Sequence, residues 1–106
     1  MPNEMINTGI AGVGAYVPDR VVTNAELEKI VDTSNEWIVS RSGIRERRIA
    51  PPEMATSDFA EIAARQAIAG AGITAEEIDL VIVATNTPDM VFPATAARPP
   101  RPASIF

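Results

Sequence analysis

The chain has 106 residues and a formal net charge of −5, and it contains neither cysteine nor histidine. An acidic balance argues against nucleic acid as a partner, and the lack of cysteine excludes disulfides and thiolate metal sites. The first residues do not show the basic and apolar regions of a secretory signal. No apolar run approaches the roughly 20 residues that span a bilayer. We therefore expect a cytoplasmic protein that binds neither membrane nor nucleic acid.

The segment 10–17 is apolar, contains regularly spaced glycines and ends before Pro18. It predicts a short buried strand, in which the glycines would let another backbone or a helix approach closely. The pattern Gly12-x-Gly14 after a strand also invites a dinucleotide-binding interpretation. That interpretation fails because the third glycine is missing and Pro18 stands where a helix should open.

Threonine followed three residues later by glutamate is the capping-box pattern that opens helices. Thr23 and Glu26 form one such box, and the apolar spacing after it predicts an amphipathic helix over residues 25–31. Thr74 and Glu77 form another, which predicts a short helical turn.

The longest predicted helix covers residues 59–69 and ends at Gly70 and Gly72. Glu61 and Arg65 lie four residues apart on its polar face, where they can form an ion pair. The candidates for its N-terminal cap are Thr56, Ser57 and Asp58.

The run 80–84, Leu-Val-Ile-Val-Ala, is apolar without alternation. Such a run predicts a strand buried on both faces, as in a parallel sheet covered by helices. The order strand, helices, strand fits a layered α/β fold.

The helix that carries Trp37 is the most informative part of the sequence. Thr33 and Glu36 form a capping box that would open it, and Gly43 would end it. Trp37 and Arg41 lie four residues apart and therefore share one helix face. An indole beside a guanidinium can hold a purine ring, and the arginine can also pair with phosphate. The spacing thus favours a nucleotide-like ligand, although the residues alone also allow a Trp37 buried in the core.

Several blocks of the chain, between about residue 10 and residue 96, together resemble a known family. They are Gly12-Val13-Gly14-Ala15-Tyr16-Val17-Pro18, Thr23-Asn24-Ala25-Glu26-Leu27, Glu36-Trp37-Ile38, Arg41-x-Gly43-Ile44-Arg45-Glu46-Arg47, Val83-Ala84-Thr85 and Phe92-Pro93-Ala94-Thr95-Ala96. They resemble the N-terminal part of beta-ketoacyl-acyl-carrier-protein synthase III, a condensing enzyme of the thiolase superfamily. Asn35 departs from the aspartate usual at that position. The resemblance implies part of a thiolase-like αβαβα fold, an incomplete first half.

The resemblance also implies site residues. In the family, the matching tryptophan and arginine clasp the adenine of coenzyme A, and the threonine at the start of the same helix contacts this ligand. Thr33, Trp37 and Arg41 are therefore expected to bind coenzyme A. The matching phenylalanine belongs to a dimer-interface segment that reaches the partner's acyl pocket, so Phe92 is expected to contact substrate in a homodimer. From the residues alone, Phe92 is instead a loop hydrophobe tucked under the sheet.

Four of the nine basic residues lie within eight positions of this acidic chain. They are Arg41, Arg45, Arg47 and Arg48. This cluster could attract the phosphates of coenzyme A or an acidic carrier protein, or it could form a solvated face with local pairs to Glu46.

By resemblance, the parent enzyme is an acyltransferase that condenses acyl-coenzyme A with malonyl-acyl carrier protein and starts fatty-acid or polyketide synthesis. It holds no permanently bound cofactor and no metal. Its cysteine, histidine and asparagine lie beyond the matching region, so this chain has no catalytic residue and is expected to be inactive alone. One alternative is an interaction module that dimerises with a full-length synthase. Another is a related acyl-coenzyme A condensing enzyme of polyketide priming.

The segment 97–106 departs from the family pattern and holds three of the nine prolines. Proline inside a helix costs about 3 kcal/mol or more, so this segment cannot form the helix that follows in the family. We expect residues 1–96 to form the family part and residues 97–106 a proline-rich tail produced by a shifted reading frame. A proline-rich docking peptide is the alternative.

Overall fold

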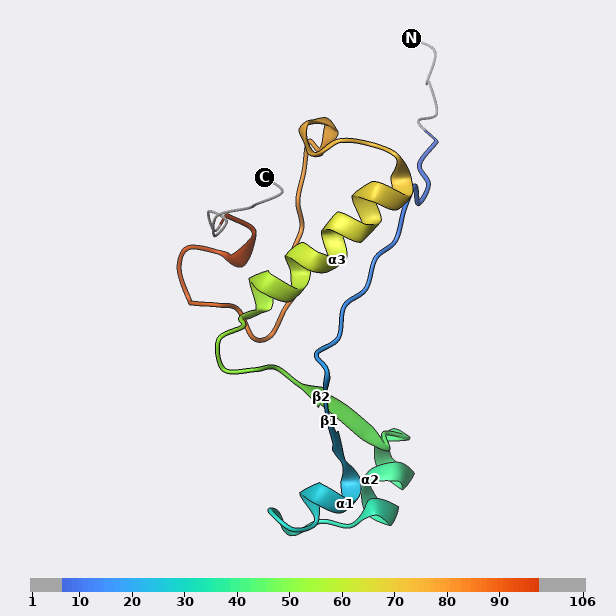
Figure 1. Ribbon diagram of the computed structural model, residues 1–106, viewed down its shortest axis with the longest axis vertical. Coiled ribbons are helices and arrows are strands. Elements are labelled where there is room, and N and C mark those ends of the chain that lie inside the picture. The colour runs from blue at the N-terminus through green and yellow to red at the C-terminus, as the bar shows by residue number, and fades with distance from the viewer. Residues whose placement is uncertain (1–6, 98–106) are drawn as a thin grey trace. The chain divides into compact units, whose positions relative to one another are not determined.

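The computed structural model describes residues 7–97, and the chain divides into two compact units. The hairpin unit is Val17–Ala55, and the α3 unit combines Met1–Tyr16 with Thr56–Phe106. Figure 1 shows the elements of both. None of the helices in the described part of the chain is long and apolar enough to cross a membrane. The proline-rich tail lies outside the described residues except for residue 97, so the division at residue 96 stays a prediction.

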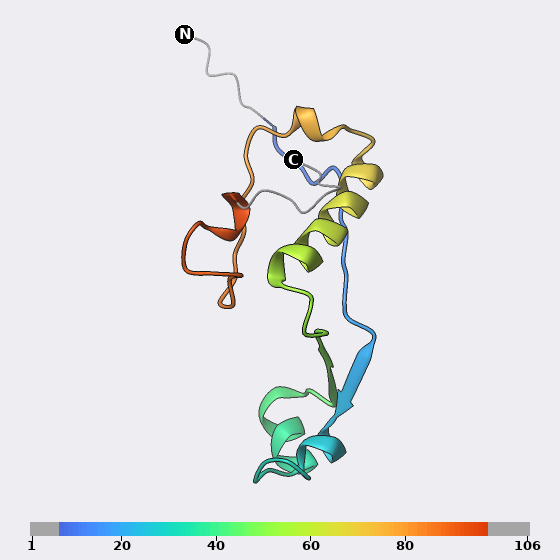
Figure 2. The ribbon, with the colours of Figure 1, turned by 60° about the vertical axis from the view of Figure 1, so that its left-hand side comes forward.

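The hairpin unit is built on two short antiparallel strands, β1 (Arg20–Thr23) and β2 (Glu46–Ile49), with Thr23 opposite Glu46 and Arg20 opposite Ile49. Two helices, α1 (Asn24–Leu27) and α2 (Asn35–Ser42), connect the strands and lie at one end of the hairpin in both ribbon views (Figures 1 and 2). Only Val22 and Asn24 are buried among the described residues of the chain. This unit therefore depends on hydrogen bonds as much as on an apolar core.

The predicted capping box of α1 is confirmed, and the helix begins at Asn24, one residue before the predicted start. Thr23 is the N-cap, its hydroxyl accepting from the Glu26 amide at 3.3 Å, while the Glu26 carboxylate accepts from the Thr23 amide at 2.8 Å. The predicted extent, 25–31, is wrong because the α-helix stops at Leu27 and continues as turns. Ile30 is 75% exposed, so the later residues gain no apolar burial that would hold them in a regular helix.

The predicted cap of α2 is wrong by one residue. Ser34, in extended conformation, is the N-cap, and its hydroxyl accepts from the Trp37 amide at 3.2 Å. A serine is as good a cap as a threonine, and here Ser34 stands three residues before the amide that needs an acceptor. The predicted stop is confirmed, because Gly43 has a φ of 73° and donates to the Val39 carbonyl at 2.8 Å.

The longest helix, α3 (Thr56–Ala71), extends beyond the predicted 59–69 at both ends. The three predicted cap residues instead form its first turn. A distant loop supplies the cap, since the Asp89 carboxylate accepts from both the amide and the hydroxyl of Ser57. Gly70 lies inside the helix, so the expectation that it ends the helix is wrong, whereas Gly72 follows the helix with a φ of 69°.

Two further local predictions are confirmed. Glu61 and Arg65 form the expected ion pair on α3 at 2.8 Å. Thr74 precedes a single 3₁₀ turn, η1 (Ala75–Glu77), and its amide donates to the Glu77 carboxylate at 2.7 Å. A second 3₁₀ turn, η2 (Thr95–Ala97), ends the described part of the chain.

Residues 10–16 run along α3 in both ribbon views (Figures 1 and 2). A Cβ atom at Gly12 would lie 2.2 Å from the Ala67 carbonyl oxygen, and one at Gly14 would lie 2.0 Å from that of Ala63. Only glycine fits at these positions without a shift. The predicted close approach of a helix is therefore confirmed.

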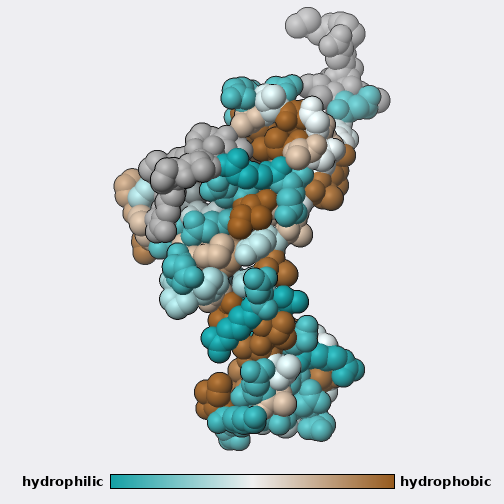
Figure 3. All heavy atoms as spheres, viewed as in Figure 1, coloured by the Kyte–Doolittle hydropathy of each residue, from teal (hydrophilic) through white to brown (hydrophobic). Residues whose placement is uncertain are grey.

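The strands predicted at 10–17 and 80–84 do not form. Neither segment belongs to a sheet, because the one sheet among the described residues joins β1 to β2. Ile10 and Ile82 are 88% and 81% exposed, so the predicted burial is wrong as well. A strand needs a hydrogen-bonded neighbour, and within residues 7–97 neither segment has one. Apolar patches consequently lie open on the surface, as Figure 3 shows.

Candidate functional site

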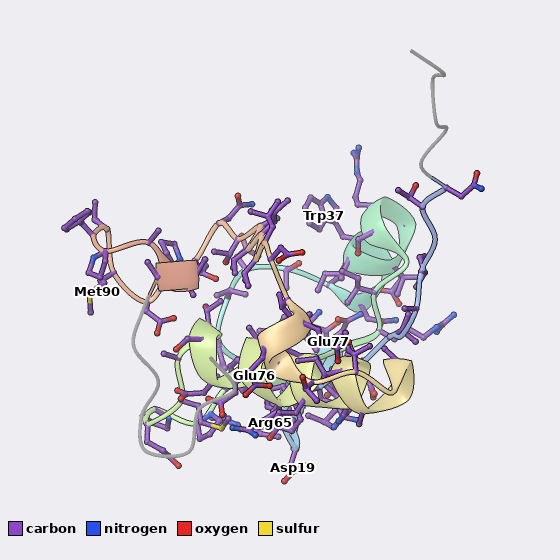
Figure 4. The ribbon with its side chains drawn as sticks, turned by 90° about the horizontal axis from the view of Figure 1, so that it is seen from above. Asp19, Trp37, Arg65, Glu76, Glu77 and Met90 are labelled. Atoms are coloured by element: carbon purple, nitrogen blue, oxygen red, sulfur yellow. The ribbon has the colours of Figure 1, made fainter. Side chains whose placement is uncertain are left out.

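Trp37 and Arg41 form the candidate binding site on α2. The guanidinium carbon of Arg41 lies 6.0 Å from the centroid of the Trp37 ring, a cation–π distance. Trp37 is 59% exposed, and its ring projects from α2 in Figure 4. The predicted shared face is confirmed, and the alternative of a buried core tryptophan is wrong. The exposed indole and the neighbouring cation can receive a flat, anionic ligand.

Thr33 lies two residues before α2 and is half-buried. Because Ser34 caps the helix, the Thr33 hydroxyl is not used as its cap. None of the hydrogen bonds found among residues 7–97 involves this hydroxyl, so it keeps its capacity to donate to a ligand.

Two of the four clustered arginines hold the hairpin unit together. Arg47 donates to the Val22 carbonyl at 3.3 Å and to the Asn24 side-chain oxygen at 2.7 Å. Arg48 donates to the Pro18 carbonyl at 3.0 Å. Their guanidinium groups bind neutral acceptors within the unit. Arg41 is the arginine of the cluster whose guanidinium lies over the Trp37 ring.

Asn24 is not among the site residues predicted from the sequence, yet it is the most buried residue described, at 2% exposed. Its side-chain nitrogen donates to the side-chain oxygen of Asn35 and to the Ile44 carbonyl, each at 2.9 Å. The only available signal was its place directly after the Thr23 cap, inside a motif of the resemblance.

Phe92 lies in the α3 unit, in a different unit from Trp37. It is 86% exposed, so the alternative of a loop hydrophobe tucked under the sheet is wrong. The loop before it is anchored to the first turn of α3 by Asp89 through Ser57 and by the Thr87 carbonyl, which accepts from Thr56. Phe92 therefore projects from an anchored loop.

Two carboxylates, Glu26 and Glu76, have lowered pKa values. Hydrogen bonds from the Thr23 amide and then from its hydroxyl lower the pKa of Glu26 below 4.5. The Glu76 backbone amide and then the Thr74 hydroxyl lower the pKa of Glu76. Residues 7–97 hold no group of three or more side chains that could bind a metal ion. These two carboxylates stabilise local turns, not a reacting group.

Curated relatives match most of the chain. A beta-ketoacyl-[acyl-carrier-protein] synthase III from Symbiobacterium thermophilum is 64% identical over 89 residues, which are 84% of this chain and 27% of that protein. A protein of the same name from Xanthomonas oryzae is 54% identical over 94 residues, 89% of this chain and 29% of that one. The chain is homologous to part of beta-ketoacyl-[acyl-carrier-protein] synthase III. It spans less than a third of the length of these relatives, and no family model matches it.

Solved structures agree with this homology. The synthase III of Aquifex aeolicus superimposes with a TM-score of 0.77 at 52% identity, over 85% of this chain and 29% of that one. The priming beta-ketosynthase of the R1128 polyketide pathway gives 0.75 at 41% identity, over 82% and 26%. The chain therefore has part of the thiolase-like α/β fold of synthase III, as the resemblance implied.

Proposed function

We propose that the hairpin unit is the coenzyme A-recognising part of a beta-ketoacyl-acyl-carrier-protein synthase III. The observation that carries this proposal is the exposed Trp37 ring with the Arg41 guanidinium 6.0 Å from its centroid. The adenine of coenzyme A stacks on the indole, an interaction worth roughly 1–3 kcal/mol per base. The Arg41 guanidinium donates to a phosphate, and the Thr33 hydroxyl supplies a further hydrogen bond.

The parent enzyme transfers an acyl group from acyl-coenzyme A to a cysteine thiolate and then condenses it with malonyl-acyl carrier protein, releasing carbon dioxide. It works as a cytoplasmic homodimer with the carrier protein as partner, and starts fatty-acid synthesis. The higher identity to the Aquifex synthase than to the polyketide priming enzyme favours this role over polyketide priming. The 106 residues contain no cysteine, and this chain alone carries out no condensation because a thiolate nucleophile is required.

A fluorescence titration tests the proposal, since Trp37 is the one tryptophan of the chain. Adding coenzyme A to the full chain quenches Trp37 with saturation, at a Kd above the micromolar range because the rest of the pocket is absent. Arg41→Ala weakens binding about tenfold, which corresponds to one charge-assisted hydrogen bond. Lys29→Ala removes a cation of the same unit and is the matched control. Equal losses in both variants, or no saturation, would contradict the proposal.

A second candidate function, favoured by the exposure of Phe92 and Val91, is an interaction module that binds a full-length synthase. Exposed large apolar side chains on an anchored loop are typical of a protein-binding surface. Co-purification of the tagged chain with a full-length synthase, lost on Phe92→Ser, supports this function. Recovery of equal amounts of synthase with Phe92→Ser excludes the Phe92 loop as its interface.

A further inference from the structure

We infer that Asn24 is the positioning residue of the Trp37–Arg41 pair, because its side-chain amide ties both ends of α2 to the hairpin. The binding part of this inference rests on the proposed function. The inference adds a residue outside α2 that controls how the helix presents its ligand-binding face.

The two donors of one amide reach the two ends of α2. Asn24 Nδ2 donates to Oδ1 of Asn35, which is the first residue of the helix, at 2.9 Å. The same nitrogen donates to the carbonyl of Ile44, directly after the helix-ending Gly43, at 2.9 Å. A single side chain thus contacts both the first residue of α2 and the backbone just after its end.

The other atoms of Asn24 attach it to the hairpin. Its backbone amide donates to the Arg45 carbonyl at 3.1 Å, next to β2. Its side-chain oxygen accepts from Arg47 at 2.7 Å, and the same guanidinium donates to the Val22 carbonyl of β1. The amide therefore links α2 to both strands, in a buried position where hydrogen bonds are strong.

Packing alone cannot hold α2 in place. No residue of α2 is buried, and Ile38 and Val39 are only half-buried. When a helix has little apolar contact, its orientation depends on its polar attachments. The Asn35 amide also donates to the Glu28 carboxylate, which attaches the start of α2 to the residue after α1. Trp37 and Arg41 project from this helix, so their orientation relative to the hairpin depends on these attachments, and the Asn24 amide supplies one at each end of the helix.

Asn24→Asp tests the inference most directly, because it removes only the side-chain donors. The aspartate keeps the shape of the side chain and an acceptor for Arg47, but it has no donor for Asn35 Oδ1 or Ile44. Val22→Ala is the control, because it weakens the core of the same unit without touching the two ends of α2. Both are made in the full chain and compared by Trp37 fluorescence during coenzyme A titration and by amide hydrogen exchange.

We expect Asn24→Asp to raise the Kd for coenzyme A at least tenfold and to speed exchange in α2 at least tenfold, with β1 and β2 changed less than twofold. Val22→Ala should speed exchange in strands and helix alike. A Kd within twofold of the unsubstituted chain overturns the inference, and so does equal loss of protection in α2 and in the strands. If Asn24→Asp does not fold, Asn35→Ala removes one attachment, and an unchanged α2 exchange rate then overturns the inference.

The fluorescence titration and the hydrogen-exchange measurement test the proposed function and this inference separately. If coenzyme A never quenches Trp37 in the unsubstituted chain, the proposed function fails. Hydrogen exchange in α2 still decides whether Asn24 holds the helix, because that measurement needs no ligand.

Discussion

Asn35 stands at the first position of α2, where the family usually has aspartate. The structure uses its side-chain oxygen, which accepts from the Asn24 amide. An aspartate offers the same acceptor, and a negative charge at a helix N-terminus is favourable. The departure from the family pattern therefore preserves the interaction that this position makes.

We predict that Asn35→Asp leaves the free energy of unfolding within about 0.5 kcal/mol. Asn35→Ala removes the acceptor and leaves a buried donor of Asn24 without its partner, which costs about 1–3 kcal/mol. Urea unfolding followed by Trp37 fluorescence measures both. Equal stability of the alanine and aspartate variants would contradict the role given to the Asn35 oxygen.

Glu26 gives the hairpin unit a pH dependence. Its pKa is lower in the folded chain because the Thr23 amide and hydroxyl donate to its ionised carboxylate. A depressed folded pKa contributes stability that is present above the unfolded value, near 4.5, and is lost as the pH falls through the folded value. We predict that Glu26→Gln flattens this loss below pH 4.5, as measured by urea unfolding at several pH values. Glu46→Gln, at the exposed start of β2, is the control, and an identical flattening there would contradict the prediction.

At the scale of elements, the contact between segment 10–17 and α3 depends on glycine. A Cβ atom at Gly14 would lie 2.0 Å from the Ala63 carbonyl oxygen, which belongs to a rigid helix backbone. We predict that Gly14→Ala destabilises the α3 unit by about 1–3 kcal/mol, the usual cost of overpacking. Thermal unfolding followed by circular dichroism measures the loss.

Gly9→Ala is the matched control, because a Cβ atom there meets nothing within 4 Å. It should change stability by less than about 0.5 kcal/mol. Equal destabilisation by the two substitutions would show that backbone freedom, not contact with α3, explains the glycines.

Elements fixed by neighbouring residues were predictable from the sequence. The Thr23 cap and the Gly43 stop follow from patterns within one helical turn, and both are observed. The start of α3 was not predictable, because Asp89 accepts from Ser57 across 32 positions of the chain. The same difference holds at the site: helix spacing predicts Trp37 beside Arg41, whereas the Asn24 attachments come from residues 11 to 23 positions away.

For the whole molecule, the sequence indicated burial that the described residues do not supply. The apolar run 80–84 predicts a strand covered on both faces, yet Leu80 and Ile82 are largely exposed. An apolar run shows that a segment favours a buried position. It forms a strand only when a second backbone segment lies beside it to form the hydrogen bonds of the sheet. The chain spans less than a third of its curated relatives, and a sheet strand is stable only with its neighbours.

Exposed apolar segments without a ladder partner should make the chain associate with itself. We predict that its weight-average sedimentation coefficient rises with protein concentration, and that Ile82→Lys suppresses this rise because a lysine opposes stacking of the segment.

Ile30→Lys is the matched control. Ile30 is similarly exposed, 75% against 81% for Ile82, and the charge change is identical, but it lies in a turn of the hairpin unit. Association through segment 80–84 requires that only Ile82→Lys reduces it. If both lysine variants suppress association equally, the association is a nonspecific effect of exposed apolar surface. If the sedimentation coefficient does not depend on concentration, the unpaired segments do not cause association.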